Sequence, residues 1–492
     1  MKSMSMRPLV TTLCARWAEA LACLAALPML AGAADHRGPS WDFRHGPLKV
    51  SEDRRFLVHA DGTPFFYLGD TAWELFHRLD RDDAARYLET RRRQGFTVIQ
   101  AVLLAEFDGL GEPNAYGHRP LIEHDPARPD VKPGARNDYW DHAGELVGMA
   151  AERGIYVGLL PTWGDKAGPK KWGQGPVIFN VENARAYGRF LGARYRDAPN
   201  VIWILGGDRP AVDEKEGDFR AVWNAMAAGL HEGDGGRHVM TYHPMGGRSS
   251  SEWFHETPWL AFNMLQSGHG AKDGANYKMI AADYARTPTK PVLDGEPRYE
   301  DHPVDWKPEK GWFDDYDVRQ AAYWALFAGA FGHTYGCHDV WQMLAPGRKP
   351  VSSARTDWRQ AVDLPGAWQM GHVRRLMLSR PFLSRIPDAA LIAGGQGDGA
   401  DHIEATRDRD GAYAFVYLPT GRPVTVDLER LRGTRVKAWW FDPRTGTAAA
   451  LGEWPRQGAR EFDPPGEPAR GNDWVLVLDD ASKRFLPPGE VR

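Results

Sequence analysis

Two acidic residues follow short apolar runs, and their type suits paired acid–base chemistry. Asp208 comes after the run 201–205 (VIWIL) and two glycines, and Glu296 comes after the run 291–294 (PVLD) and one glycine. Cleavage of a glycosidic bond needs one carboxyl group to protonate the leaving oxygen and another to attack the anomeric carbon or activate water. We therefore predict Asp208 and Glu296 as the catalytic pair. The alternative for each is a helix N-cap, a common position for an acidic residue after a strand.

Further acidic side chains follow or end other apolar runs. Glu106 is a candidate for a substrate contact and, as an alternative, for the catalytic acid. Asp70 could bind sugar hydroxyls or cap the next helix. Asp294 lies two residues before Glu296 and would face the same side of a strand. It could hold a neighbouring side chain by a hydrogen bond or an arginine pair.

Aromatic, amide and imidazole groups near the ends of the same runs complete a candidate sugar site. Aromatic rings pack on sugar faces, and a few polar side chains fix the orientation of the ligand. For several of these residues plain loop structure is the alternative, and most of the 20 Trp residues are expected in the core. The predicted substrate contacts are Asp70, Trp73, Glu106, Asn114, Tyr116, Trp163, His243, Gln266, His269, Tyr299, His338 and Trp341.

The sequence gives less support to a metal or a cofactor. Metal-dependent barrel hydrolases usually carry H-x-H after the first strand, where this chain has Gly69-Asp70-Thr71. His243, His269 and His338 could converge on a metal, but hydrogen bonds to sugar hydroxyls are the favoured interpretation. The chain has neither a P-loop nor a G-x-G-x-x-G fingerprint. We predict no metal and no cofactor.

Eight apolar runs alternate with helical or connecting stretches. Such alternation is typical of a parallel α/β sheet, and eight repeats predict a (β/α)8 barrel of the TIM type. The active site of such a barrel lies at the carboxyl ends of its strands, where Asp208 and Glu296 occur. The runs are 65–69, 98–104, 156–160, 201–205, 238–242, 260–264, 291–294 and 332–335, and the clearest helices are 80–93, 138–153, 181–196, 219–231 and 317–331.

The pattern changes after about residue 383. Short alternating runs such as 413–418 (YAFVYL) and 474–478 (WVLVL) replace the helical periodicity, with turn signals between them. This pattern predicts a small C-terminal β-sandwich. The predicted organisation is a signal peptide at 1–34, a catalytic barrel at 35–382 that opens with a β-hairpin near 41–62, and a β-sandwich domain at 383–492.

The N-terminal segment has the composition of a secretory signal peptide. Lys2 and Arg7 precede the apolar run 20–30 (ALACLAALPML), and 31–33 (AGA) is a small-residue cleavage site. The run is too short to span a bilayer. We therefore expect a secreted or periplasmic protein without a membrane span. Cys337 is the one cysteine after residue 34, which excludes an internal disulfide framework.

The composition of the chain limits the kinds of molecule that it is expected to bind. Of the 492 residues, 42% are hydrophobic and 26% charged, as in ordinary globular proteins. The net charge of −4 offers no basic surface for nucleic acid. We expect a monomer whose partner is an oligo- or polysaccharide.

Several of these segments together resemble a known family. The segments 61–73 (DGTPFFYLGDTAW), 95–100 (GFTVIQ), 200–208 (NVIWILGGD) and 294–300 (DGEPRYE) are similar to those of the apiosidase-like glycoside hydrolases, glycoside hydrolase family 140. The similarity covers nearly the whole chain after the signal peptide, and the tail resembles the collagen-binding-type β-domain of such proteins. The resemblance implies a (β/α)8 barrel with a C-terminal β-sandwich. It also implies Asp208 as acid/base, Glu296 as nucleophile, and release of apiose-linked side chains from the pectic polysaccharide rhamnogalacturonan II.

The expected mechanism is a retaining double displacement, with Glu296 as nucleophile and Asp208 as acid and then base. One alternative is a glycosidase with a different sugar specificity. Others are a non-catalytic protein that binds a glycan or matrix with the same barrel, and a metal-dependent hydrolase. A pure binding protein would have no reason to keep a carboxylate pair at close range.

Overall fold

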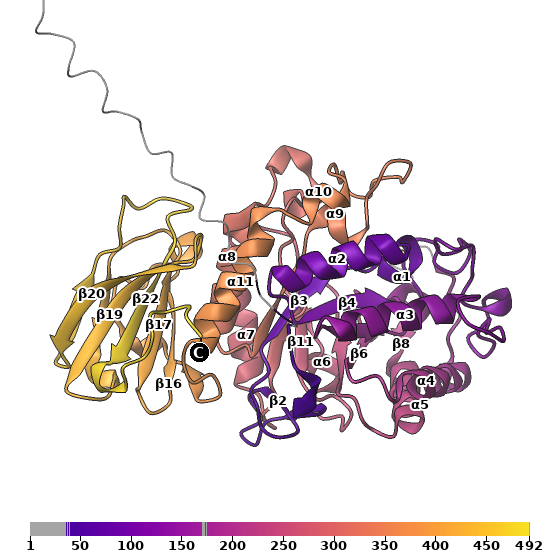
Figure 1. The fold of residues 1–492 in the computed structure, drawn as a ribbon, viewed down its shortest axis with the longest axis horizontal. Coiled ribbons are helices and arrows are strands. Elements are labelled where there is room, and N and C mark those ends of the chain that lie inside the picture. The colour runs from indigo at the N-terminus through magenta and orange to yellow at the C-terminus, as the bar shows by residue number, and fades with distance from the viewer. Residues whose placement is uncertain (1–35, 37, 39, 170–172, 174, 492) are drawn as a thin grey trace, which may run out of the picture. The chain divides into compact units, whose positions relative to one another are not determined.

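The computed structural model describes residues 36, 38, 40–169, 173 and 175–491. A nearly closed barrel of eight parallel strands lies at its centre, surrounded by helices (Figure 1). In spatial order the strands are β11 (Asn263–Gln266), β12 (Val292–Asp294), β13 (Gly332–Tyr335), β3 (Tyr67–Thr71), β4 (Val98–Val102), β5 (Tyr156–Leu160), β6 (Val201–Gly206) and β9 (Met240–His243). Each strand overlaps one of the eight apolar runs.

The barrel strands are buried along their whole length, which explains the continuous apolar sequences of β5 and β6. The ends of the sheet approach each other between β9 and the segment before β11, where the Ala261 amide donates to the Met240 carbonyl at 2.8 Å. Strand β13 pairs with β3 through Gly332, whose Cβ would lie 2.3 Å from the Tyr67 carbonyl oxygen if the residue had one. A glycine is therefore required at this contact. A short strand β10 (Arg248–Ser249) extends the sheet antiparallel to β11.

One or more helices follow each barrel strand. Asp80, Asp138, Asn180 and Asp314 each cap the start of a helix with a side-chain hydrogen bond to a backbone amide. The helices are α1 (Leu75–Arg78), α2 (Arg81–Arg93), α3 (Tyr139–Glu152), α4 (Val181–Tyr195), α5 (Arg220–Asp234), α6 (Ser251–Phe254), α7 (Asn276–Tyr284), α8 (Asp315–Phe327), α9 (His338–Trp341), α10 (Trp358–Ala361) and α11 (Pro365–Leu378).

Two antiparallel ribbons lie outside the barrel sheet. Strands β1 (Leu48–Val50) and β2 (Leu57–His59) pair before the first barrel strand, and β7 (Val212–Asp213) pairs with β8 (Gly217–Asp218) in the loop after β6. The residues predicted as a signal peptide lie outside the described part of the chain. Within the described part, no helix is long and apolar enough to cross a membrane.

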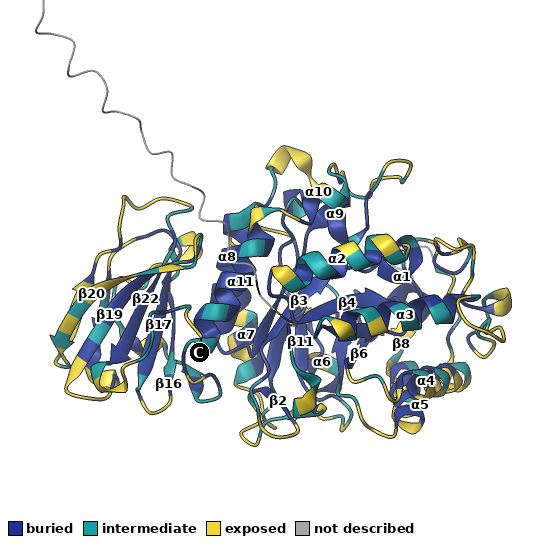
Figure 2. Ribbon diagram, viewed as in Figure 1, coloured by how far each residue is buried: buried dark blue, intermediate teal, exposed yellow. Residues whose placement is uncertain are grey.

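The C-terminal part of the chain consists of two antiparallel sheets. Side chains from both sheets form one apolar core, which includes Val416, Val426 and Leu476. The ribbon in Figure 2 is coloured buried along much of β17 and β22. The larger sheet has the order β14 (Arg385–Pro387), β16 (Glu404–Asp408), β17 (Tyr413–Leu418), β22 (Trp474–Asp480), β19 (Arg435–Asp442) and β20 (Thr447–Pro455), and the smaller has β15 (Ile392–Gly394), β18 (Val424–Asp427) and β21 (Ala459–Phe462).

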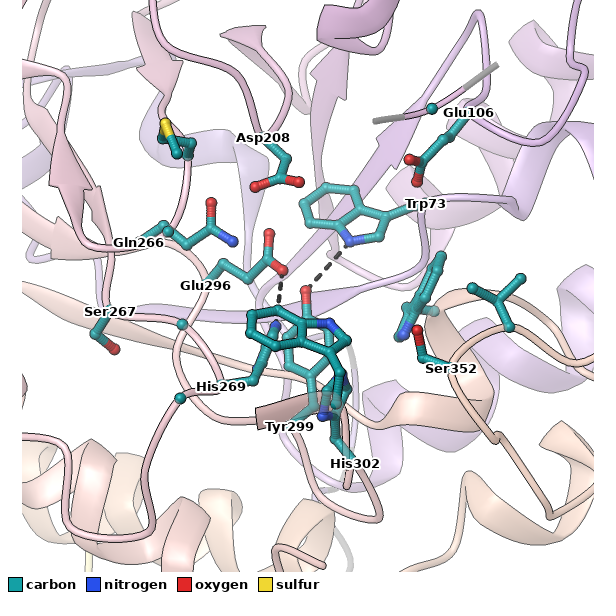
Figure 3. A pocket seen from close by; sticks show the side chains of 18 of the residues that line it. Trp73, Glu106, Asp208, Gln266, Ser267, His269, Glu296, Tyr299, His302 and Ser352 are labelled. Carbon is teal, nitrogen blue, oxygen red and sulfur yellow. Dashed lines mark hydrogen bonds and ion pairs between the residues drawn. The ribbon is translucent and has the colours of Figure 1, made fainter. Parts of the chain in front are cut away.

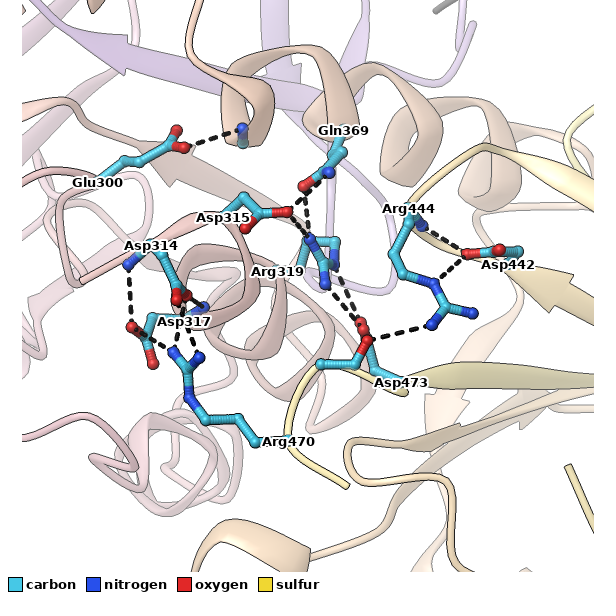
Figure 4. Close-up of polar contacts among 12 residues, drawn as sticks. Glu300, Asp314, Asp315, Asp317, Arg319, Gln369, Asp442, Arg444, Arg470 and Asp473 are labelled. Atoms are coloured by element: carbon cyan, nitrogen blue, oxygen red, sulfur yellow. Dashed lines mark hydrogen bonds and ion pairs between the residues drawn. The ribbon is translucent and has the colours of Figure 1, made fainter. Parts of the chain in front are cut away.

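Helix α8 joins the barrel to this β-rich domain through ion pairs, which Figure 4 shows, and through stacked rings. The Arg319 guanidinium donates to both carboxylate oxygens of Asp473, at 2.8 and 3.1 Å. Arg470 bonds Asp314 at the start of α8 at 2.7 Å. The ring of Tyr323 stacks on Tyr417 with 4.8 Å between centroids. The Arg319–Asp473 pair is buried, so removal of either partner would leave a desolvated charge where the two parts meet.

Candidate active site

A cavity of about 810 Å³ opens at the carboxyl ends of the barrel strands. Strand-end loops from around the barrel contribute to its wall, and Figure 3 shows their side chains pointing into it. The lining includes nine of the predicted site residues: Trp73, Glu106, Trp163, Asp208, Gln266, His269, Glu296, Tyr299 and Trp341. Side chains that are distant in sequence thus converge here because parallel strands share one end of the barrel.

Glu296 lies between two imidazoles. Nε2 of His269 is 3.1 Å from its Oε1, and Nε2 of His243 is 3.0 Å from its Oε2. Burial would raise the pKa of Glu296, but the two imidazoles outweigh it and lower the pKa to about 2. Glu296 is therefore ionised at neutral pH, as a nucleophile must be.

His243 connects Glu296 with the loop that carries Asp208. Its Nδ1 accepts a hydrogen bond from the Asp208 backbone amide at 3.2 Å. A neutral imidazole that accepts at Nδ1 carries its proton on Nε2, and that atom faces Glu296. The ring is fully buried, so its orientation is fixed by these neighbours.

The backbone before Asp208 adopts an unusual conformation. Gly206, Gly207 and Asp208 have φ values of 87°, 114° and 54°. A Cβ on Gly206 would lie 2.3 Å from the His243 carbonyl oxygen, so the chain can pass there only as glycine. Positive φ costs energy in a residue other than glycine, and such strain is concentrated at functional sites. The turn directs the partly exposed Asp208 carboxylate into the cavity, on the side facing Glu296 (Figure 3).

Glu106 has a different environment. It is half-buried in the loop after β4, and burial raises its pKa to about 8. Arg209 lowers this pKa, whereas the nearby Asp208, Asp165 and Glu74 raise it further. Glu106 therefore carries a proton at neutral pH, in contrast to Glu296.

Aromatic rings form much of the remaining wall. Trp73 and Trp163 lie 5.2 Å apart, and Phe107 and Trp341 lie 5.4 Å apart, measured between ring centroids. Trp73 also donates a hydrogen bond from Nε1 to the Tyr299 hydroxyl at 3.2 Å. Rings held in this way provide flat apolar surfaces against which sugar faces can pack.

Three histidine rings pack in a row at one side of the cavity, with His302 stacked on His269 and edge-to-face with His338. His302 lies between His269 and His338, with centroid distances of 4.4 and 4.3 Å. Burial and both neighbours lower the pKa of His302, and its Nδ1 donates to the Pro303 carbonyl at 2.7 Å. His338 lies behind the wall, where its Nε2 is 3.0 Å from the Ser352 carbonyl. In the part of the chain described, no three His, Cys, Asp or Glu side chains are placed to hold a metal ion.

Five predicted substrate contacts do not line the cavity: His243 and His338, whose partners are given above, and Asp70, Asn114 and Tyr116. Asp70 is buried in an ion pair with Arg91 at 2.7 Å. The Asn114 side chain accepts from two backbone amides of its own loop at 3.0 Å. The Tyr116 hydroxyl accepts from the Arg81 amide at 2.9 Å. Asp70 thus neither caps a helix nor faces the cavity, and for Asn114 and Tyr116 the loop alternative describes the structure.

The wall also contains side chains that were not among the predicted contacts. They include Phe107, Met245, Ser267, His302, Trp306 and Ser352. Phe107 and Ser267 directly follow predicted residues, and His302 and Trp306 lie within the ten residues after Glu296. Extending each strand end by a few residues would have found these four. Ser352 comes from a loop after α9, and no sequence signal indicates its position.

A cavity that presents an ionised carboxylate, a second carboxylate facing it and aromatic walls has the composition of a glycoside hydrolase active site. Comparison with known families agrees. Residues 51–384 match the family model described as "Apiosidase-like, catalytic domain", and the chain belongs to this family. Residues 386–479 match the model described as "Putative collagen-binding domain of a collagenase".

Solved structures support the same class. One titled "Glycoside hydrolase" is 37% identical to this chain with a TM-score of 0.83, and the match covers 91% of this chain and 99% of that one. Another, titled as a glycoside hydrolase family 5 from Bacteroides vulgatus ATCC 8482, is 35% identical with a TM-score of 0.84 and covers 91% and 98%. No curated protein matches the sequence. The chain is a glycoside hydrolase of the apiosidase-like family.

Proposed function

We propose that this enzyme is secreted and hydrolyses a glycosidic bond in a pectic plant cell-wall glycan, with the apiosyl linkages of rhamnogalacturonan II as the first candidate. The observation that carries the proposal is the pairing of Asp208 and Glu296 at the strand ends of an apiosidase-like domain. The description of the family model favours apiose as the sugar released. The segments that resemble glycoside hydrolase family 140 favour the same linkage.

We infer a retaining double displacement. A Glu296 oxygen attacks the anomeric carbon and forms a glycosyl–enzyme ester, while the bond to the leaving oxygen breaks and that oxygen takes the proton of Asp208. In the second step Asp208 takes a proton from water, the water oxygen attacks the anomeric carbon, and Glu296 is released as a carboxylate. The ionised state of Glu296 supports its part in this scheme.

We also propose an assignment for the two parts of the fold. We take the nearly closed barrel, with helices after each strand, as a (β/α)8 barrel of the TIM type, and the two C-terminal sheets as a β-sandwich. We propose that the β-domain has a structural role and shields one side of the barrel, since the ion pair between Arg319 of α8 and Asp473 of the β-domain is buried. The apolar run before residue 34 supports export to the periplasm or the medium, and we expect the mature enzyme to be a monomer.

The decisive experiment is product release from a panel of pectic oligosaccharides, with the wild type beside Glu296→Gln. Release of apiose-ended products by the wild type alone would support the substrate, the class of linkage and the nucleophile together. Early NMR spectra of the product would give its anomeric configuration, and inversion would overturn the double displacement. If the enzyme were active only on other glycans, it would still be a glycosidase, but the proposed substrate would be wrong.

A further inference from the structure

One acidic residue of the cavity has no part in the double displacement. Glu106 lies in the loop after β4 and lines the cavity, as do the neighbouring Phe107 and the ring of Trp341 that packs on Phe107. In the view of Figure 3, Trp73 lies between Glu106 and the pair Asp208–Glu296. Glu106 thus belongs to a region of the cavity with aromatic walls, next to the reacting carboxylates.

The carboxyl group of Glu106 has no protein partner among the described residues. It makes no hydrogen bond or ion pair there, and only the backbone carbonyl of this residue is used, by the Asp108 amide at 3.0 Å. A half-buried carboxyl group without a partner is costly unless a ligand or water satisfies it. This group is therefore available to a ligand in the cavity.

The charged groups around Glu106 are mostly of its own sign. Asp208 on the β6 loop, Asp165 on the β5 loop and Glu74 after β3 disfavour its ionisation, and Arg209 opposes them. Together with burial they raise the pKa of Glu106 to about 8. At neutral pH the group has one O–H donor, which an ionised carboxylate lacks.

We propose that Glu106 binds the glycan as an uncharged carboxylic acid, donating a hydrogen bond to a sugar oxygen while Phe107 and Trp341 pack against the sugar. The inference rests on the proposed function, because it needs a glycan in this cavity. It adds a specificity-determining residue and an alkaline limit to binding. If only the protonated form binds, affinity falls about tenfold for each pH unit above the pKa of Glu106.

A first experiment tests the protonation state without any ligand. Because the pKa of Glu106 is raised in the folded state, its proton stabilises the fold below the ordinary value near 4.5, and this contribution is lost as pH rises towards 8. The Tm of the wild type minus that of Glu106→Gln should therefore fall between pH 5 and 8, by at least about 2 °C, and then level off. Parallel Tm profiles would overturn the inference.

A second experiment tests the donor role by calorimetry in the inactive Glu296→Gln background. The probe is an apiose-ended oligosaccharide of rhamnogalacturonan II, titrated between pH 6 and 10. We expect binding to weaken above pH 8 with Glu106 and to stay constant with Glu106→Gln, whose amide still donates. Glu106→Leu, which cannot donate, should bind about tenfold more weakly at every pH. The same pH dependence with and without Glu106 would overturn the donor role.

The two experiments separate this inference from the substrate assignment. If the oligosaccharide binds neither to the Glu296→Gln enzyme nor to its Glu106→Gln derivative at any pH, the proposed substrate is wrong. The Tm profiles then decide the protonation state by themselves, and the binding series is repeated with whichever glycan the wild type cleaves.

Discussion

On the β9–β12 side of the cavity Glu296 lies between two imidazoles. On the β4–β6 side Glu106 lies near several carboxylates, among them that of Asp208, which itself pairs with Arg209 at 3.4 Å. Burial raises the pKa of both glutamates. The imidazoles then lower that of Glu296 to about 2, and the carboxylates help to raise that of Glu106 to about 8. Two residues of one type therefore differ in charge at neutral pH because their partners differ.

The two environments therefore place an ionised carboxylate, Glu296, and a protonated carboxyl group, Glu106, in one cavity at neutral pH. His243 stands between the two sides, with Nδ1 on the Asp208 amide and Nε2 towards Glu296. The following substitutions alter one side at a time.

The largest effect is expected on the imidazole side. Glu296→Gln removes the nucleophile but keeps its size, so kcat should fall by more than about 10⁴-fold while the fold is retained. Steady-state kinetics and circular dichroism test this. Glu300→Gln is the matched control, because Glu300 is buried outside the cavity on the Tyr335 hydroxyl and should tolerate the change. Similar losses in both variants would mean that the Glu296 effect is structural.

The next effect is expected on the acidic side. Asp208→Asn should lower kcat by about 10²- to 10⁴-fold on a natural glycoside, because the leaving oxygen no longer receives a proton. Asn tolerates the positive φ of this position, so the turn should survive. An aryl glycoside with an acidic leaving group needs little protonation and should lose much less. If kcat fell equally on both substrates, Asp208 would not be the catalytic acid.

A smaller effect should follow from weakening one imidazole contact. His269→Gln removes a ring that lowers the pKa of Glu296, so this pKa should rise by about one unit. The acid limb of the kcat/KM profile should then move to higher pH, because Glu296 must be ionised to attack. His302→Gln is the control: its ring stacks on His269 but makes no bond to Glu296, so the limb should stay in place.

Most of the barrel and its two facing carboxylates could be predicted from the sequence. The apolar runs located the strands, and the active site of such a barrel lies at the carboxyl ends of its strands. The apolar runs 156–160 and 201–205 coincide with β5 and most of β6, since strands buried on both faces leave a continuous apolar signal. His243 and His269 were predicted as site residues, but their contacts with Glu296 were not. The two imidazoles come from β9 and from the loop after β11, so they meet Glu296 only in three dimensions. Asp70 was misjudged for a similar reason: its partner Arg91 lies on α2.

The smallest effect is expected at the rim of the imidazole side. Trp306 is 53% exposed and has its ring 5.8 Å from that of His269, measured between centroids. Its position allows the indole to cover one face of a bound sugar without contact with the reacting carboxylates. Trp306→Ala should therefore raise KM by about three- to tenfold and change kcat little.

Michaelis–Menten kinetics on the substrate identified from the panel would measure this effect. Trp454→Ala is the matched control, since Trp454 packs in the β-domain against Phe462 and should leave KM unchanged. If Trp306→Ala lowered kcat and left KM unchanged, the ring would act on the reacting groups through His269. In that case Trp306 would also influence Glu296, although it does not touch it. The difference between the two sides of the cavity would then involve residues beyond the direct partners of Glu296.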